Sequence, residues 1–125
     1  MSREIKFRIW DKHCEQYSDD CILYCYTGEI AEWGGFNYNS YVDNRFVAEQ
    51  YTGLKDKNGE EIYEGDIVSE HHGDIIGKIT QKPSGEYRID WIGIYGGSSS
   101  LYDELSMCEV IGNIHENPEL LESKK

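Results

Sequence analysis

Hydrophobic and polar residues alternate with a period of two along most of the chain, which is typical of half-buried β-strands. The first example is the stretch in which Ile5, Phe7 and Ile9 alternate with polar neighbours. Further strands are expected at residues 21–26, 46–52, 67–68, 75–79, 87–91 and 108–114, while residues 29–33 fit either a strand or a loop. Strands this short, separated by Gly-based turns, favour a small β-barrel over packed helices.

The connections between these strands have their own signals. Lys57-Asn58-Gly59 is the strongest turn signal, because Asn-Gly accepts the two positive φ angles of a type I′ hairpin. The Gly- and Ser-rich run at residues 96–100 indicates a flexible loop. The sequence predicts one short helix at the C-terminus, where Asn117 suits the N-cap and Pro118 the first helical position.

Length and composition set the domain organisation. A chain of 125 residues suffices for one compact domain or two small lobes. The composition shifts to Gly, Asn, Ser, Tyr and Phe at residues 34–45, which marks a long loop or a boundary. We therefore expect an N-terminal β-rich segment, residues 1–50, that carries a Tyr/Asn/Gly-rich loop, followed by a second part, residues 51–125.

The charge balance is strongly acidic, which limits the kinds of molecule that the chain can bind. The chain has 24 Asp and Glu against 12 Lys and Arg, a net charge of −12. This field repels nucleic acids and anionic membranes, so we expect no direct nucleic-acid partner and no membrane partner. The chain lacks an apolar run of the ~18 residues that a membrane span needs, and residues 1–10 lack a secretory h-region. A cytoplasmic location is therefore expected.

Three stretches carry a family resemblance. The first is KFRIWD at residues 6–11, and the last is EVIGNIHENPELL at residues 109–121. Between them lies QYTGLKDKNGEEIYEGDIV at residues 50–68, which we call the central signature. In this order the three stretches resemble the YopX-like family of phage and prophage proteins, a family of unknown function. The intervening residues 12–49 and 70–107 carry no match.

The resemblance implies an origin in a bacteriophage or prophage of a Gram-positive host and an SH3-type β-barrel in the C-terminal half. It supplies no catalytic residue. The sequence itself also lacks a nucleophile motif, a phosphate-binding Gly loop and a zinc-ligand spacing. We therefore expect no enzymatic activity, no cofactor and no metal. The cysteines are expected to be buried thiols, and the His71-His72 pair an exposed turn.

Two sets of residues are candidates for binding. The first is aromatic, because Tyr beside Gly, Ser and Asn is typical of adaptable recognition surfaces. Its members are Trp33, Phe36, Tyr38 and Tyr41, with packing onto the barrel as the alternative. They would contact a host or phage protein, or a second copy in a homo-oligomer.

The second set is acidic. Its members are Glu60, Glu61, Glu64, Asp66, Glu70 and Asp74, a run without a basic residue between Lys57 and Lys78. On one face they would imitate a nucleic-acid backbone and inhibit a DNA- or RNA-binding protein. The alternative is a solvated surface that only keeps the chain soluble.

Overall fold

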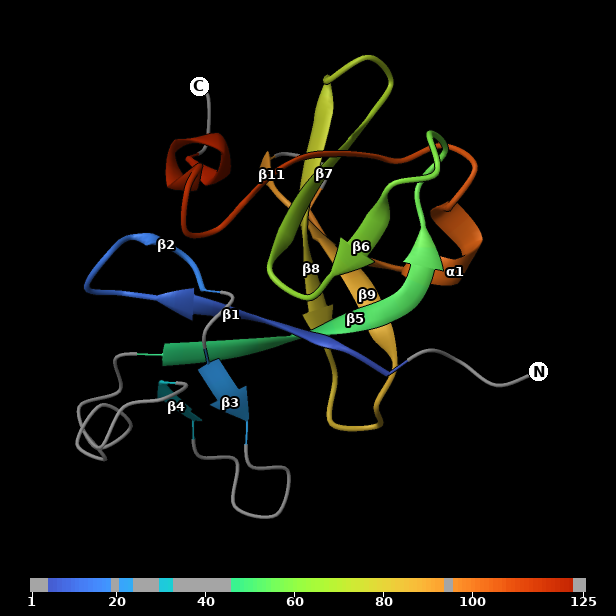
Figure 1. The fold of residues 1–125 in the computed structure, drawn as a ribbon. Coiled ribbons are helices and arrows are strands. Elements are labelled where there is room, and N and C mark those ends of the chain that lie inside the picture. The colour runs from blue at the N-terminus through green and yellow to red at the C-terminus, as the bar shows by residue number, and fades with distance from the viewer. Residues whose placement is uncertain (1–4, 19–20, 24–29, 33–45, 94–95, 123–125) are drawn as a thin grey trace. The chain divides into compact units, whose positions relative to one another are not determined.

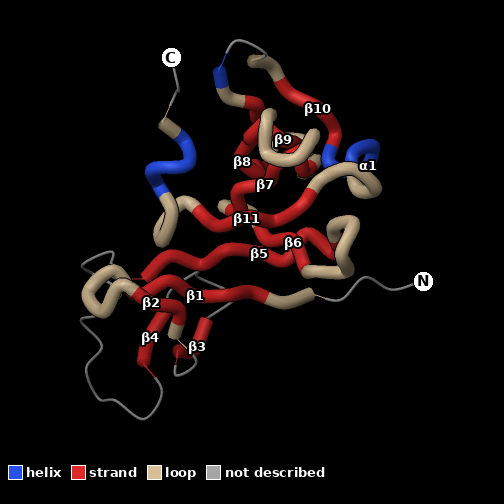
Figure 2. Tube along the Cα trace, turned by 90° about the horizontal axis from the view of Figure 1, so that it is seen from above, coloured by secondary structure: helices blue, strands red, loops and turns tan. Residues whose placement is uncertain are grey.

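The computed structural model describes residues 5–18, 21–23, 30–32, 46–93 and 96–122. Strands make up most of the described chain, and helix is confined to short segments (Figures 1 and 2). The protein is therefore mainly β, as the alternating pattern predicts. The chain divides into two compact units, Lys6–Gln50 and Tyr51–Lys125 with Met1–Ile5, which we call the smaller and the larger unit.

The described part of the smaller unit contains short antiparallel pairs. Its strands are β1 (Phe7–Asp11), β2 (Gln16–Tyr17), β3 (Cys21–Leu23) and β4 (Ile30–Glu32). β1 pairs with β2 and β3 pairs with β4. β5 (Phe46–Lys55) contains the boundary between the two units. Its residues up to Gln50 pair with β1, and its residues from Tyr51 onward pair with β6 (Glu61–Tyr63).

The buried end of β1 differs from the sequence prediction. Alternation assigns Ile5 and Phe7 to a buried face, yet both side chains are exposed. Burial begins at Ile9, which packs with Phe46 and Ala48 of β5. Among the described residues, Ile9 packs on β5 and Trp10 packs against Tyr17 of β2, and the sequence of β1 alone cannot indicate where such partners begin.

The larger unit is built on an antiparallel sheet in the order β10-β9-β8-β7-β11. Its elements after β6 are β7 (Asp66–Glu70), β8 (Ile75–Gln81), β9 (Tyr87–Trp91), β10 (Ser98–Ser100), α1 (Leu101–Glu104), β11 (Glu109–Asn113) and the 3₁₀ helix η3 (Pro118–Leu121). β7 to β10 follow one another as a meander, and β11 returns to pair with β7.

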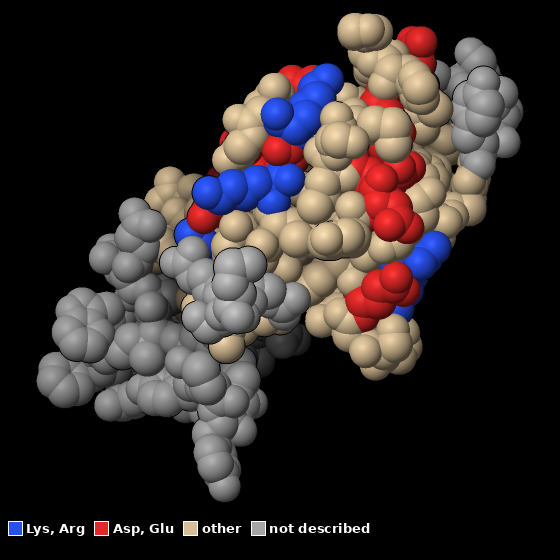
Figure 3. Space-filling view, turned by 90° about the vertical axis from the view of Figure 1, so that its right-hand side faces the viewer, with Lys and Arg blue, Asp and Glu red and all other residues tan. Residues whose placement is uncertain are grey.

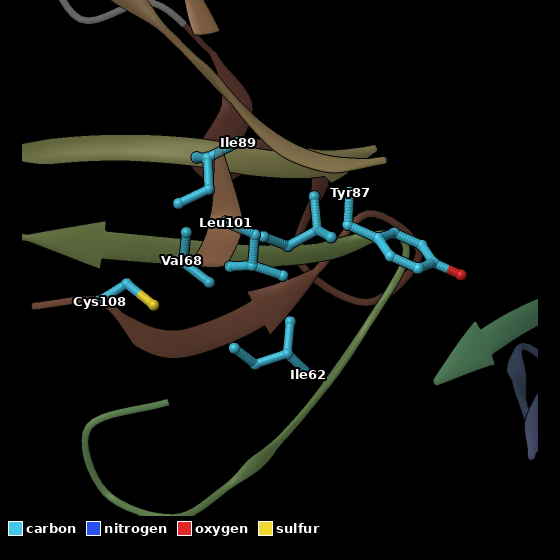
Figure 4. Packing of buried hydrophobic residues seen from close by; sticks show 7 residues of the cluster. Ile62, Val68, Tyr87, Ile89, Leu101 and Cys108 are labelled. Carbon is cyan, nitrogen blue, oxygen red and sulfur yellow. The ribbon is translucent and has the colours of Figure 1, made fainter. Parts of the chain in front are cut away.

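The core of the larger unit gathers apolar side chains from most of these elements (Figure 4). Its buried members are Ile62, Val68, Ile79, Tyr87, Ile89, Leu101 and Cys108. The side chain of Tyr87 extends from the cluster with its hydroxyl pointing away (Figure 4). Alternate residues of β8 and β9 enter this core, which accounts for the period of two in their sequences.

One close approach in this sheet depends on a glycine. A Cβ built on Gly77 of β8 would lie 2.4 Å from Cγ2 of Ile89 and 2.8 Å from Cε3 of Trp91. Real Cβ atoms do not approach other heavy atoms so closely. Gly77 therefore allows the side chains of β9 to lie over the backbone of β8.

The Asn58-Gly59 turn is not the predicted type I′ hairpin. Gly59 has a φ of +83°, but Asn58 is absent from the non-glycine residues with positive φ, so only one of the two required angles is present. Gly59 N donates to Asp56 O, and Asp56 N donates to Glu60 O. This is the geometry of a type I turn followed by a left-handed glycine.

The helices and the loop before α1 also differ from expectation. Residues 98–100 form strand β10 where a flexible loop was predicted, because Arg88 and Trp91 of β9 hydrogen-bond to Ser98 and Ser99. Helix α1 was not predicted. The C-terminal helix is present at Pro118–Leu121 but is 3₁₀, and its N-cap residue Asn117 makes no side-chain capping bond.

Candidate binding surface

The buried polar residues of the central signature hold backbone turns. Asp56 is the clearest example: its Oδ1 accepts the N–H groups of Asn58 and Glu60 at 2.8 and 2.9 Å. Its Oδ2 accepts the N–H of Val110 in β11 at 2.9 Å. One carboxylate therefore fixes the β5–β6 turn and joins it to a strand 54 residues further along the chain.

Other polar residues of the family stretches act similarly. The Thr52 hydroxyl donates to Ile62 O at 2.7 Å, and Asp66 Oδ2 accepts the N–H of Tyr63 at 2.8 Å. In the last stretch, Asn113 Oδ1 accepts the N–H groups of His115 and Glu116. Buried polar groups need partners of this kind. These contacts give the family residues a structural explanation that requires no catalytic role.

Glu70, two residues beyond the signature, is different. Its side chain is 6% exposed, and its Oε2 is the buried side-chain oxygen without a hydrogen-bond partner among the described residues. Burial raises the pKa of Glu70, and the carboxylate of Glu104 in α1 raises it further, while His71 opposes the shift. Glu70 therefore retains its proton to a higher pH than an ordinary glutamate.

The thiol of Cys108 interacts electrostatically with the carboxylate of Glu70. Burial, then the carboxylates of Asp56 and Glu70, raise the pKa of the Cys108 thiol to about 11. A thiol at that pKa is protonated at neutral pH and is a poor nucleophile. The expectation of a buried thiol is confirmed for Cys108, whereas Cys14 is exposed. Cys14 lies in the polar turn between β1 and β2.

The turn after Glu70 has an unusual backbone. His71 and His72 have φ angles of 54° and 59°, and Gly73 follows at 93°. The Gly73 N–H donates to Glu70 O, so His71 and His72 occupy the two central positions of a type I′ turn. Both histidines are exposed, as the sequence predicts. Non-glycine residues rarely adopt this conformation.

Among the described residues of the smaller unit, Arg8 and Glu49 form a buried ion pair. Glu49 of β5 accepts hydrogen bonds from Arg8 Nε at 2.8 Å and the Tyr17 hydroxyl at 2.9 Å. The Arg8 guanidinium lies 4.6 Å from the centre of the Tyr17 ring, and Trp10 meets that ring edge-on. The group joins β1, β2 and β5 and satisfies Glu49, which is consistent with a structural role.

Two basic residues of the larger unit, Lys82 in the β8–β9 turn and Arg88 on β9, form ion pairs close to their own strands. Lys82 Nζ lies 3.0 Å from Asp90 Oδ1, and the Thr80 hydroxyl donates to Asp90 Oδ2 at 3.0 Å. Although burial acts to raise the pKa of Asp90, the bonds from Lys82 and Thr80 hold it below its usual value. Arg88 bonds to Glu86 and Ser98. These cations are thus engaged within the sheet.

Exposed apolar side chains lie elsewhere in the larger unit. Tyr102 is 72% exposed, Met107 45% and Ile111 37%. All three fall within Tyr102–Ile111, which runs from α1 to β11 and which we call the α1–β11 surface. Figure 3 shows the side of the molecule on which α1 lies in Figure 1, with a row of acidic side chains on this face.

The predicted site residues fall in different places. Trp33, Phe36, Tyr38 and Tyr41 lie outside the described residues. Of the six acidic residues, Asp66 and Glu70 are buried, so they cannot belong to a solvated face. Glu60 and Asp74 are exposed, and Glu61 and Glu64 are half-buried. Asp66 is buried because it holds a turn, which a count of charges along the sequence does not reveal.

Sequence reasoning missed the α1–β11 surface. A signal was present: Leu101 and Leu105 are four residues apart, the spacing of one helix face. Leu101 is a buried core residue and Leu105 packs against the same cluster. That spacing leaves Tyr102 and Asp103 on the outer side of the turn. Four residues are too few for a periodicity to stand out.

Within the part of the chain that the structure describes, no three His, Cys, Asp or Glu side chains are grouped so as to hold a metal ion. The described helices are all too short or too polar to cross a membrane.

Comparison with known proteins identifies the class. The model of the YopX protein family matches residues 6–122, so the chain belongs to this family. The chain is also similar to protein EF1440 from Enterococcus faecalis, known from a crystal structure, with 30% sequence identity and a TM-score of 0.64. The similarity covers 97% of this chain and 100% of that one. A search of the curated proteins finds no match.

Proposed function

We propose that the chain is a protein-binding module without catalytic activity, encoded by a phage or prophage and acting in the cytoplasm of a bacterial host. The observation that carries this proposal is a contrast between polar side chains with structural contacts and apolar side chains that remain exposed. Asp56, Asp66 and Asn113 hold turns, whereas Tyr102 and Met107 stay exposed. Apolar side chains left at a surface are typical of interaction sites.

We further propose that the larger unit is an SH3-type barrel. The β7–β10 meander and the return of β11 to β7 support this. Two backbone bonds also link the turns around β6 to the sheet: Lys57 N donates to Cys108 O, and Gly65 N donates to Ile79 O. Amide-to-amide NOEs across both contacts in solution are the expected result. Their absence, with the meander intact, would indicate an open sheet.

The partner is a host or phage protein, and a second copy of the chain is the alternative. Two areas are candidates for the contact: the α1–β11 surface and the aromatic residues of the 33–41 segment. The test compares how much partner protein the tagged wild type captures from host lysate with how much two variants capture, Tyr102→Ser/Met107→Ser and Tyr38→Ser/Tyr41→Ser. Circular dichroism first confirms that both variants are folded. Loss in one variant assigns the contact; unchanged capture in both refutes both placements. Light scattering identifies self-association.

The acidic mimic is the rival function. It requires partner binding that weakens steeply with salt and is competed by duplex DNA. The burial of Asp66 and Glu70 removes two of the six acids on which it rests. Capture that resists both salt and DNA would exclude it.

A further inference from the structure

The α1–β11 surface combines apolar and acidic side chains. Apart from Ile5, the exposed large apolar residues described in the larger unit are those of this surface, Tyr102, Met107 and Ile111. Asp103 is exposed between them, and Glu104 and Glu109 are half-buried. Such a surface is suited to a partner that has apolar side chains and positive charge.

The segment that forms this surface has no basic residue of its own. Residues 89–123 contain no Lys or Arg. Lys57 Nζ lies 3.9 Å from Glu109 Oε2, and both side chains are in contact with solvent, so this pair is weak. Lys82 and Arg88 are engaged around β8 and β9, as described above, and among the described residues no ion pair involves Asp103 or Glu104. The acids of the surface are therefore available for a cation from another molecule.

Glu70 adds an independent observation. It is the buried carboxylate whose Oε2 has no hydrogen-bond partner among the described residues. Its carboxylate interacts electrostatically with the Glu104 carboxylate and the Cys108 thiol, both of which belong to the Tyr102–Ile111 segment. Two carboxylates in this relation repel each other, and a cation seated over Glu104 would relieve that repulsion.

We propose that the α1–β11 surface binds a basic amphipathic segment of a partner protein. The apolar side chains of that segment pack on Tyr102, Met107 and Ile111, while its Lys or Arg side chains lie against Asp103 and Glu104. This inference rests on the proposed binding function and gives it a partner class. Pairing of this surface with its own copy about a two-fold axis is disfavoured, because it sets acidic residues against acidic residues.

The test uses the full-length protein and three labelled 14-residue peptides, measured by fluorescence anisotropy over a series of salt concentrations. The first peptide is built from Leu and Lys at helical spacing. The second replaces each Lys by Glu, and the third replaces each Leu by Ser. Only the first peptide is expected to bind, with an affinity that falls as salt rises.

Variants then locate the site. Tyr102→Ser/Met107→Ser and Asp103→Asn/Glu104→Gln are each expected to weaken binding of the Leu-Lys peptide about tenfold, the effect of losing about 1.4 kcal/mol. Glu119→Gln/Glu122→Gln removes the same charge from exposed positions and should change affinity less than twofold. Circular dichroism spectra confirm that each variant is folded.

Several outcomes would overturn the proposal. If Glu119→Gln/Glu122→Gln weakens binding of the Leu-Lys peptide as much as Asp103→Asn/Glu104→Gln does, the peptide responds only to the net charge of the protein. If the Ser peptide binds as tightly as the Leu-Lys peptide, the apolar side chains do not contribute to binding. If no peptide binds and the Tyr102→Ser/Met107→Ser variant still captures a partner, the α1–β11 surface is not the binding site, although the protein does bind a partner. Failure of all peptides with no partner captured refutes both.

Discussion

At the scale of single residues, two buried carboxylates differ in whether their oxygens accept hydrogen bonds from the fold. Asp56 and Glu70 have the same low exposure, yet Asp56 accepts three backbone N–H groups and Glu70 keeps one oxygen without a partner among the described residues. The sequence does not distinguish them, because both are acids that border strands. The difference arises from which backbone N–H groups the fold brings to each side chain.

Asp56→Ala should destabilise the protein strongly. The change removes the acceptor of three N–H groups, including that of Val110 in a distant strand. Hydrogen bonds to charged groups are worth more than neutral ones, so a loss of about 3 kcal/mol in the free energy of unfolding is expected. Urea denaturation measures it, with the exposed Asp74→Ala as a control expected to change stability by less than about 0.5 kcal/mol. Equal losses in both would contradict the role given to Asp56.

Glu70→Gln should alter how stability depends on pH. Because the folded pKa of Glu70 is raised, its carboxyl favours folding most below the unfolded pKa, and that contribution is lost as pH rises through the folded pKa. The glutamine variant cannot ionise, so its stability relative to the wild type should increase with rising pH.

Thermal unfolding at several pH values above 4 measures this effect. Glu104→Gln, which removes the repelling neighbour, should reduce the pH dependence without abolishing it. Asp90 has a lowered pKa and contributes with the opposite sign, because its stabilisation is lost as pH falls. A constant difference between Glu70→Gln and the wild type at every pH would contradict the raised pKa.

At the scale of elements, hydrophobic alternation located the strands better than it located their connections. β9 coincides with its predicted span, and β8 and β11 lie within about two residues of theirs. These strands have one face in the core, and that burial imposes the period of two. Residues 98–100 form a strand despite their serines, because side chains of β9 hydrogen-bond to them, and composition carries no trace of that support.

Turn chemistry was only partly predictable for the same reason. The Asn-Gly pair did mark a turn, but Asp56 selects its type by binding two N–H groups within it. The type I′ geometry occurs instead at His71-His72, residues with little preference for it.

His72→Gly should therefore stabilise the β7–β8 turn. Glycine adopts the left-handed conformation without the Cβ penalty, and the gain is expected to be about 0.5–1 kcal/mol. His115→Gly is the matched control, since His115 is not among the residues with positive φ and should lose stability. Chemical denaturation of both variants decides the matter. A loss at His72 similar to that at His115 would indicate that the turn does not carry this strain.

At the scale of the whole molecule, the family and the β class follow from the sequence, whereas the candidate surface does not. The three family stretches lie within the matched residues 6–122, and the structure explains their polar residues by the turns that they hold. The α1–β11 surface lies outside the stretches in which the family resemblance was recognised, apart from its last residues. The polar residues of these stretches that hold turns are buried, whereas Tyr102 and Met107 lie outside the stretches and are exposed.

The central claim is that this protein acts by binding another protein. The most direct measurement is capture of the tagged, full-length protein from host lysate, with and without phage infection, read by mass spectrometry across a series of salt concentrations. The account predicts one stoichiometric partner whose retention falls in Tyr102→Ser/Met107→Ser and is unchanged in Glu119→Gln/Glu122→Gln. Recovery of the bait alone under every condition, as a monomer by light scattering, would contradict it.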